Sequence, residues 1–176
     1  MQAASQQRDG MERSVLVLGD VKWGARDAAE DGVLTGNEIA GLKLRGTQLV
    51  NATACFSAEG AVQVGEGLLG LRTAFLQAGS QAVMTSLWNI SDVASCVFAD
   101  LFYARLQRDK QEPSRALQET MRQFQRSQGL PTGRCIPPGA KYDGRSLQLS
   151  HPHNWAGYVL LGSDRFLALP SASRAD

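Results

Sequence analysis

Residues Gln48–Asn89 read QLVNATACFSAEGAVQVGEGLLGLRTAFLQAGSQAVMTSLWN, and this stretch decides the fold that the sequence predicts. An apolar run ends at Cys55, a polar segment with glycine follows, a helical pattern comes next, and a second apolar run ends at Trp88. This order is typical of parallel strands joined by a helix. Because α/β proteins keep reactive groups at the carboxyl ends of their strands, we expect the Cys55 thiol at the mouth of a parallel sheet.

The rest of the chain continues the alternation of strands and helices. Thr35 and Glu38 have the spacing of a capping box, and Gly79 ends one helical pattern. Ser91 is expected to cap a further helix, and Pro113 fits the first turn of another. The pattern predicts an α/β fold with a mostly parallel central sheet and helices on both faces. Strands are expected at residues 14–18, 48–54, 81–87 and 155–161, and helices at 35–42, 67–77, 91–106 and 113–128, the last with Leu117, Met121 and Phe124 buried.

Length and composition predict one globular domain. The chain has 176 residues, 43% of them hydrophobic and 20% charged, so a packed core is expected. Its 18 basic and 17 acidic residues give a net charge of +1, which favours neither nucleic acid nor an anionic membrane as a partner. No apolar run is long enough for a membrane span, and the first ten residues lack the apolar core of a secretory signal. A cytoplasmic location is therefore expected.

The three cysteines, Cys55, Cys96 and Cys135, form an odd set without C-x-x-C spacing. This argues against a zinc site and against a disulfide framework, and it favours a reducing compartment. Cys96 lies among apolar residues of a helical pattern and is expected in the core, whereas Cys135 lies in a long Pro/Gly-rich loop as an oxidisable thiol. No metal and no cofactor is expected.

Cys55 is the candidate nucleophile. A thiol attacks as the thiolate, which a neighbouring histidine normally generates, and backbone amides then stabilise the oxyanion. The turn Ser57–Gly60 is suited to direct amides and thiol the same way. A cysteine after an apolar run is also the pattern of a buried structural thiol, and both interpretations stay open on this residue alone.

Several motifs in a fixed order resemble the CHAT domain, a caspase-like cysteine peptidase family related to the separases and often fused to helical repeats. The upstream match is Gly32–Thr35, and the downstream match is Trp155–Gly162, so the resemblance covers most of the chain. It implies a caspase-like α/β sandwich, Cys55 as the nucleophile, a peptide substrate and a helical-repeat (TPR-like) partner segment. The central motifs are Thr53-Ala54-Cys55, Gly65-Glu66-Gly67, RTAFLQAG at Arg72–Gly79 and SLWNISD at Ser86–Asp92.

The chain departs from the family pattern in two places. The box continues as Phe56-Ser57-Ala58 instead of Glu/Gln-Thr-Gly, and no histidine occurs between Met1 and Ala54. In caspase-like enzymes the histidine lies about 50 residues before the cysteine. The resemblance therefore implies the C-terminal part of a CHAT domain, with strands lost ahead of Ser14. We expect a disordered N-terminus at 1–12, a partial CHAT domain at 13–166 and a loose tail at 167–176.

Other polar residues have a functional and a plain interpretation. Asp92 borders the substrate pocket in relatives, where a carboxylate pairs with a basic side chain, and it also suits the start of a helix. Glu66 has the same plain interpretation. His151 and His153 match a stretch that only precedes the last family strand, and each is interpreted as a loop histidine. The glycines Gly65, Gly67 and Gly70 lack the Lys-Ser/Thr of a phosphate-binding loop.

Three functions remain open on the sequence. The first is a cysteine endopeptidase whose histidine comes from an upstream segment. The second is a non-catalytic interaction or regulatory module of a helical-repeat protein. The third is a fragment that does not fold by itself, because a sheet without its outer strands exposes an apolar edge. The missing histidine favours a chain that is inactive on its own.

Overall fold

The computed structural model describes residues 15–17, 32–53, 66–127, 135 and 148–164. The chain divides into two compact units. We call Met1–Asn89 together with Gly157–Gly162 the sheet unit, and Ile90–Ala156 together with Ser163–Asp176 the helical unit. The described chain contains strands and helices in mixed order, in agreement with the predicted α/β class.

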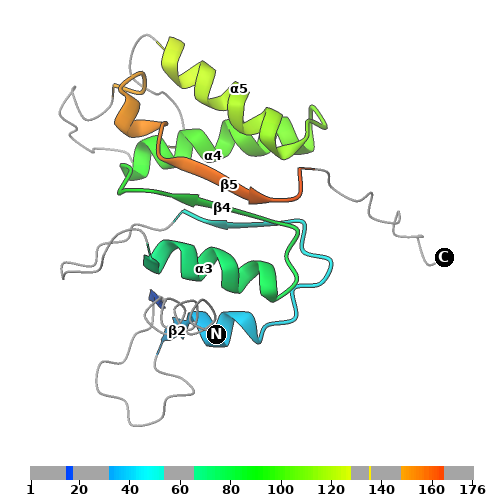
Figure 1. The fold of residues 1–176 in the computed structure, drawn as a ribbon. Helices are drawn as coiled ribbons and strands as arrows, with labels where there is room; N and C mark the ends of the chain where they lie inside the picture. The colour runs from blue at the N-terminus through cyan, green and yellow to red at the C-terminus, as the bar shows by residue number, and fades with distance from the viewer. Residues whose placement is uncertain (1–14, 18–31, 54–65, 128–134, 136–147, 165–176) are drawn as a thin grey trace. The chain divides into compact units, whose positions relative to one another are not determined.

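Three strands form the main sheet of the sheet unit (Figure 1): β3 (Leu49–Ala52), β4 (Ala82–Ser86) and β5 (Tyr158–Gly162), in the order β3-β4-β5. The central strand β4 is buried at every position, which fits its run of apolar and small residues. β3 pairs with β4 in parallel, as the sequence predicts.

The sheet is mixed where the sequence predicts a mostly parallel one. β5 runs antiparallel to β4, with Ser86 opposite Tyr158. A second pair, β1 (Val15–Val17) and β2 (Val33–Thr35), is also antiparallel. The predicted parallel order fails at β5 because two helices in succession separate it from β4, so the chain re-enters the sheet at the end where β4 leaves it. The strand at β2 is a further element that the sequence analysis left unassigned.

The two helices of the sheet unit begin and end at the signals read from the sequence. α2 (Gly36–Ala40) carries the predicted capping box: the N–H of Thr35 donates to Glu38 Oε2 at 2.7 Å, and the N–H of Glu38 donates to Thr35 Oγ1 at 3.3 Å. α3 (Glu66–Gln77) ends at Gly79, whose φ of +106° suits glycine. The N–H of Gly79 donates to Leu76 O and that of Ser80 to Phe75 O, which is the Schellman pattern.

The core of the sheet unit lies between α2, α3 and the sheet (Figure 1). Apolar side chains of all three elements meet there, so the amphipathic face predicted for α3 does cover the sheet. The buried members are Ile39, Ala52, Leu71, Ala74, Phe75 and Val83.

The helical unit is built from α4 (Asp92–Gln107) and α5 (Pro113–Arg126). Ser91 caps α4 by accepting the N–H of Ala94 at 3.2 Å, and Pro113 occupies the first turn of α5, both as predicted. The start of α5 has no cap of its own, and Asp164 accepts the N–H of Ser114 at 3.0 Å instead.

The buried stripe of α5 differs from the predicted one. Phe124 is buried, and its ring packs edge-to-face on Phe98 with centroids 5.2 Å apart. Leu117 and Met121 are only half-buried. The buried residues are Pro113, Ala116, Thr120 and Phe124, because α5 turns its small residues and one polar side chain toward α4.

The prediction that the cysteines form no disulfide is wrong for two of them. Cys96 on α4 is bonded to Cys135, 39 residues later, with 5.6 Å between their Cα atoms. Cys135 is therefore buried rather than a free loop thiol, and Cys96 is half-buried rather than a core thiol. An odd count does not exclude a pair, since one cysteine can stay outside it. Among the described helices, none has the length and apolar character needed to cross a membrane.

Candidate active site

The candidate site lies at the carboxyl edge of the parallel pair β3–β4. Both strands end there, since Ala52 is opposite Thr85 in the register. Ala52 is buried, Thr53 after it is half-buried, and Cys55 follows at the third position beyond the strand. Cys55 itself lies outside the described residues, as does the turn Ser57–Gly60. The route of β3 agrees with the predicted sheet mouth, and the placement of the thiol stays a prediction.

Arg72 of α3 is the buried cation next to this edge. Its Nε donates to Thr85 Oγ1 at 2.7 Å, so the guanidinium lies against the residue opposite Ala52. The residue is 7% exposed, and burial lowers the pKa of its guanidinium. Its Nη2 is buried without a hydrogen-bond partner among the residues that the structure describes. A buried donor without an acceptor lowers the stability of the fold unless a structural partner or a ligand accepts its hydrogen bond.

The carboxyl end of β4 meets the start of β5. The N–H of Leu87 donates to the carbonyl of Gly157 at 2.9 Å. The half-buried indole of Trp88 packs on Gly157 so closely that a Cβ there would come within 2.8 Å of Cε2. Glycine is therefore required at 157 for this contact. Two motifs far apart in the sequence, Ser-Leu-Trp and Trp-Ala-Gly-Tyr, thus meet at one edge.

Asp92 belongs to the helical unit. It is exposed in the first turn of α4, directly after the cap Ser91. A carboxylate there stabilises the helix through the positive end of the dipole, which agrees with the plain interpretation. A substrate-binding role for Asp92 stays a prediction.

The two histidines also lie in the helical unit. His151 caps the 3-10 turn η1 (Pro152–Asn154), where its Nδ1 accepts the N–H of His153 at 3.2 Å. Both imidazoles are exposed. The cap gives His151 a local structural role, in line with its interpretation as a loop histidine.

The glycines, Glu66 and two aromatic residues are the remaining candidates, and each belongs to a regular element or a packing contact. Gly67 and Gly70 lie inside α3, which is a helix and not a phosphate-binding loop, and Glu66 is its first residue. Trp155 Nε1 donates to Ser150 O at 3.0 Å, and Tyr158 is buried in β5. These two aromatics contribute to packing.

Sequence reasoning missed Arg72 as a site residue. In the sequence it is noted only as the first residue of the motif Arg72–Gly79. A signal exists, because Arg72 stands between Leu71 and Ala74 on the face of α3 that covers the sheet, where a charge needs a specific partner.

The chain belongs to the CHAT domain family, whose family model matches residues 4–163. Two curated relatives are similar to it. Tetratricopeptide repeat protein 28 of Mus musculus is 34% identical over 140 residues, 80% of this chain and 5% of that protein. Tetratricopeptide repeat protein 28 of Homo sapiens is 36% identical over 107 residues, 61% of this chain and 4% of that protein. The chain thus spans about one twentieth of the length of these relatives. No solved structure matches.

Proposed function

We propose that this chain is a CHAT module of the caspase-like sandwich type, with Cys55 as its nucleophile, and that the 176 residues alone do not cleave peptides. Two features of the sequence carry the proposal. The Thr-Ala-Cys motif follows the carboxyl end of β3, and no histidine precedes it in these 176 residues. Without an imidazole near it, a thiol is only a few per cent ionised at neutral pH.

The module acts within a larger helical-repeat protein. Both relatives are named for tetratricopeptide repeats and are about twenty times longer than the matched region, which supports a repeat segment as its partner. In that context an upstream segment supplies the histidine, the substrate is a peptide, and Asp92 pairs with a basic substrate side chain. The domain extends over residues 13–166, flanked by loose ends at 1–12 and 167–176. We also propose a cytoplasmic location and no requirement for a metal or a cofactor.

Thiol reactivity tests the proposal directly. In a Cys96→Ser, Cys135→Ser background, Cys55 is the one thiol of the chain. We expect iodoacetamide to alkylate it at the rate of free cysteine, with the same dependence on pH. A rate well above that of free cysteine at neutral pH would mean that the thiol is activated within the 176 residues, and the proposal would be wrong. Thermal unfolding of the same variant checks that it is folded.

A cleavage assay gives a second, independent result. The purified chain is incubated with a mixed peptide library, beside a Cys55→Ala control, and products are read by mass spectrometry. We expect identical, uncleaved profiles. Cleavage by the native chain that disappears in the control would contradict inactivity while supporting Cys55 as the nucleophile.

Extending the chain tests the supplied histidine. If the coding sequence upstream of residue 1 encodes, in frame, a strand ending in His-Gly, the extended polypeptide should show an accelerated alkylation of Cys55. His→Ala in that pair should return the rate to that of free cysteine. An extended chain with the pair and no acceleration would leave Cys55 without a catalytic role.

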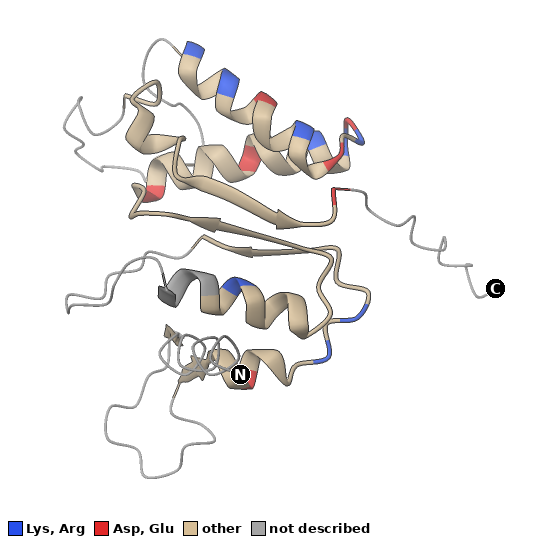
Figure 2. Ribbon diagram, viewed as in Figure 1, with Lys and Arg blue, Asp and Glu red and all other residues tan. Residues whose placement is uncertain are grey.

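A second candidate function is an interaction module, favoured by a hollow on the helical unit. It has a volume of about 530 Å³ and carries three arginines against one glutamate. Figure 2 shows that basic residues recur along α5. A net positive hollow suits an acidic peptide segment. The lining residues are Arg105, Glu119, Arg122, Gln123, Arg126 and Ser127.

A charge-reversal pair tests this second function. Arg122→Glu with Arg126→Glu reverses the charge of the hollow, whereas Arg108→Glu with Lys110→Glu makes the same charge change at exposed basic residues that do not line it. A fluorescent deca-glutamate peptide is the probe, measured by anisotropy at low salt. Loss of binding in the first variant only would support the hollow. An equal loss of peptide binding in both variants would show that binding depends on net charge and not on the hollow.

A further inference from the structure

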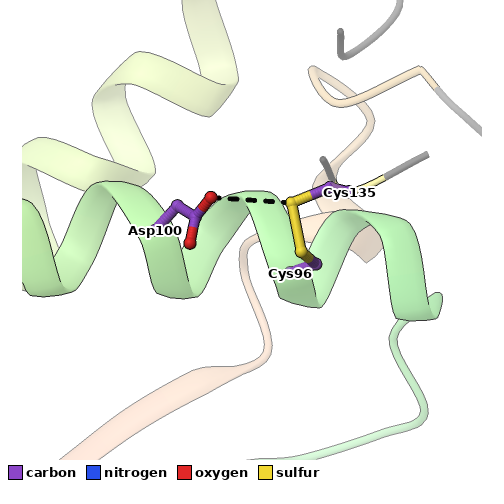
Figure 3. A group of neighbouring side chains, drawn as sticks. All are labelled: Cys96, Asp100 and Cys135. Atoms are coloured by element: carbon purple, nitrogen blue, oxygen red, sulfur yellow. Dashed lines mark hydrogen bonds between the residues drawn. A yellow bond between two sulfur atoms is a disulfide. The ribbon is translucent and has the colours of Figure 1, made fainter. Parts of the chain in front are cut away.

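Three potentially reactive side chains gather on one face of α4 (Figure 3). Cys96 and Asp100 are four residues apart, so they lie one above the other on the helix. Cys135 reaches them from the connection between α5 and η1. The sulfur and carboxylate atoms of the three residues all lie within 4.8 Å of one another.

The sulfur of Cys135 lies next to two groups, a second sulfur and a carboxylate. It is bonded to Cys96 Sγ, and it lies 3.7 Å from Asp100 Oδ2, the distance of a hydrogen bond donated by a thiol. A disulfide sulfur has no hydrogen to donate. The carboxylate is therefore placed where it could accept a hydrogen bond from the Cys135 thiol that reduction would create.

We propose that Cys96 and Cys135 are a reversible redox pair that exchanges with glutathione, and that Asp100 stabilises the dithiol form. The carboxylate accepts a hydrogen bond from the Cys135 thiol and gains nothing comparable from the disulfide. An acceptor that favours one state only shifts the equilibrium toward that state. Asp100 therefore keeps the disulfide reducible rather than permanent.

Exposure determines which sulfur exchanges with glutathione. Cys96 is half-buried on the helix surface, whereas Cys135 is 8% exposed. An external thiol or disulfide therefore reaches the sulfur of Cys96. The packing of Phe98 on Phe124 and the burial of Phe102 do not involve the two sulfurs, so we expect the helical unit to keep its fold in both states.

Oxidation proceeds in two balanced exchanges with glutathione disulfide as the oxidant. The Cys96 thiolate attacks one sulfur of glutathione disulfide, a mixed disulfide forms, and the first glutathione thiolate leaves and takes a proton. The Cys135 thiol then loses its proton to solvent and attacks the Cys96 sulfur. The protein disulfide forms and the second glutathione leaves as a thiol. Two electrons pass from the cysteine pair to glutathione disulfide, and reduction reverses these steps.

A metal ion is the competing occupant of this cluster. Two thiolates and a carboxylate are zinc ligands, but a structural zinc site takes four ligands, and the described residues offer three. Binding of zinc requires both thiolates free, so zinc and the disulfide exclude each other. Zinc binding is accordingly an outcome that the experiment distinguishes.

The experiment titrates the full 176-residue chain, carrying Cys55→Ser, with glutathione buffers of set ratio at pH 7. Free thiols are trapped with a maleimide after an acid quench and counted by intact mass. We expect two thiols to disappear together in one two-electron transition. Asp100→Ala should move the equilibrium constant about tenfold toward the disulfide, which equals about 30 mV. Asp100→Asn keeps an acceptor oxygen and should move it less.

Asp109→Ala is the matched control, since it removes an exposed carboxylate just beyond the end of α4. It should leave the transition where the parent has it. Three results would overturn the proposal: two thiols that remain free across the whole range, a midpoint unchanged in Asp100→Ala, or one equivalent of zinc bound by the reduced chain in an equilibrium dialysis. Thermal unfolding of each variant confirms that the comparison is between folded proteins.

Discussion

Arg105 of the helical unit and Arg72 of the sheet unit are two poorly exposed arginines with different surroundings. The side chain of Arg105 is 15% exposed, and each guanidinium nitrogen has an acceptor or an ion-pair partner. Its Nη1 donates to Leu101 O at 3.1 Å and Thr120 Oγ1 at 3.3 Å, and Nη2 donates to Gln123 Oε1 at 2.6 Å. Arg105 therefore joins α4 to α5 as a completed network.

The guanidinium of Arg72 has fewer hydrogen-bond partners. Thr85 Oγ1 accepts from its Nε, while Nη2 has no acceptor in the described part of the chain. Because a charged donor without a partner costs more than a neutral one, Nη2 is an unfavourable feature of Arg72 among the residues that the structure describes. A fully partnered arginine is explained by architecture, and a partly partnered one beside a strand end is a candidate for function.

Thr85→Val should have the largest effect. It removes the acceptor of Arg72 Nε and leaves the buried guanidinium without that bond, so the free energy of unfolding should fall by about 3 kcal/mol. Urea unfolding measures it. Thr85→Ser keeps the hydroxyl and loses one methyl group, which should cost about 1 kcal/mol. Equal losses in the two variants would show that the hydrogen bond contributes nothing.

Arg72→Met in the Thr85→Val background should recover about 2 kcal/mol of that loss, because an apolar side chain of similar length removes the unpaired charge. The same urea titration, completed as a double-mutant cycle, gives the coupling between the two residues. Additive effects of Arg72→Met and Thr85→Val would contradict a direct interaction.

Thr120→Val should cost less than Thr85→Val, about 1 kcal/mol, although Thr120 is just as buried. Arg105 keeps Leu101 O, Gln123 and Glu119 when the Thr120 hydroxyl is lost. Unfolding of the two valine variants under one condition compares the networks. A larger loss at Thr120 than at Thr85 would reverse the distinction between the arginines.

Acid should produce the smallest effect, at one carboxylate of each unit. The backbone N–H of Thr35, followed by its hydroxyl, lowers the pKa of Glu38. Gln111, followed by Arg115, lowers the pKa of Glu119. A pKa lowered by folding stabilises the native state above the ordinary glutamate range, and this contribution is lost as the pH falls through the lowered pKa.

The midpoint of thermal unfolding, measured between pH 6 and 3, tests whether stability falls with the pH. The parent should lose stability on acidification, and Glu38→Gln and Glu119→Gln should each have a shallower slope. A parent midpoint that rises toward pH 3 would contradict the assignment.

Local signals predicted most of the secondary structure. The capping box at Thr35, the cap at Ser91 and the stop at Gly79 each act within one helical turn, so the sequence alone indicates them. Strand β4 was also found, since every one of its positions is buried and the run has no polar alternation. Motif order was sufficient to identify the family.

Contacts between distant residues could not be predicted in this way. The direction of β5 depends on the path through two helices, and the bond between Cys96 and Cys135 depends on where a 39-residue connection returns. Thr120 is polar in the sequence and buried in the structure, because Arg105 and the carbonyl of Ala116 give it partners. Arg72 was overlooked for the same reason, since its acceptor is 13 residues away on β4.

The late position of β5 has a consequence for synthesis. Tyr158–Gly162 completes the sheet only after the whole stretch that forms α4 and α5 has been translated. Until then one side of β4 lacks its neighbour, and an open strand edge is a template for association with other chains. The nascent polypeptide therefore passes through a stage at the ribosome in which early pairing of β4 by a chaperone or a second chain competes with its native partner.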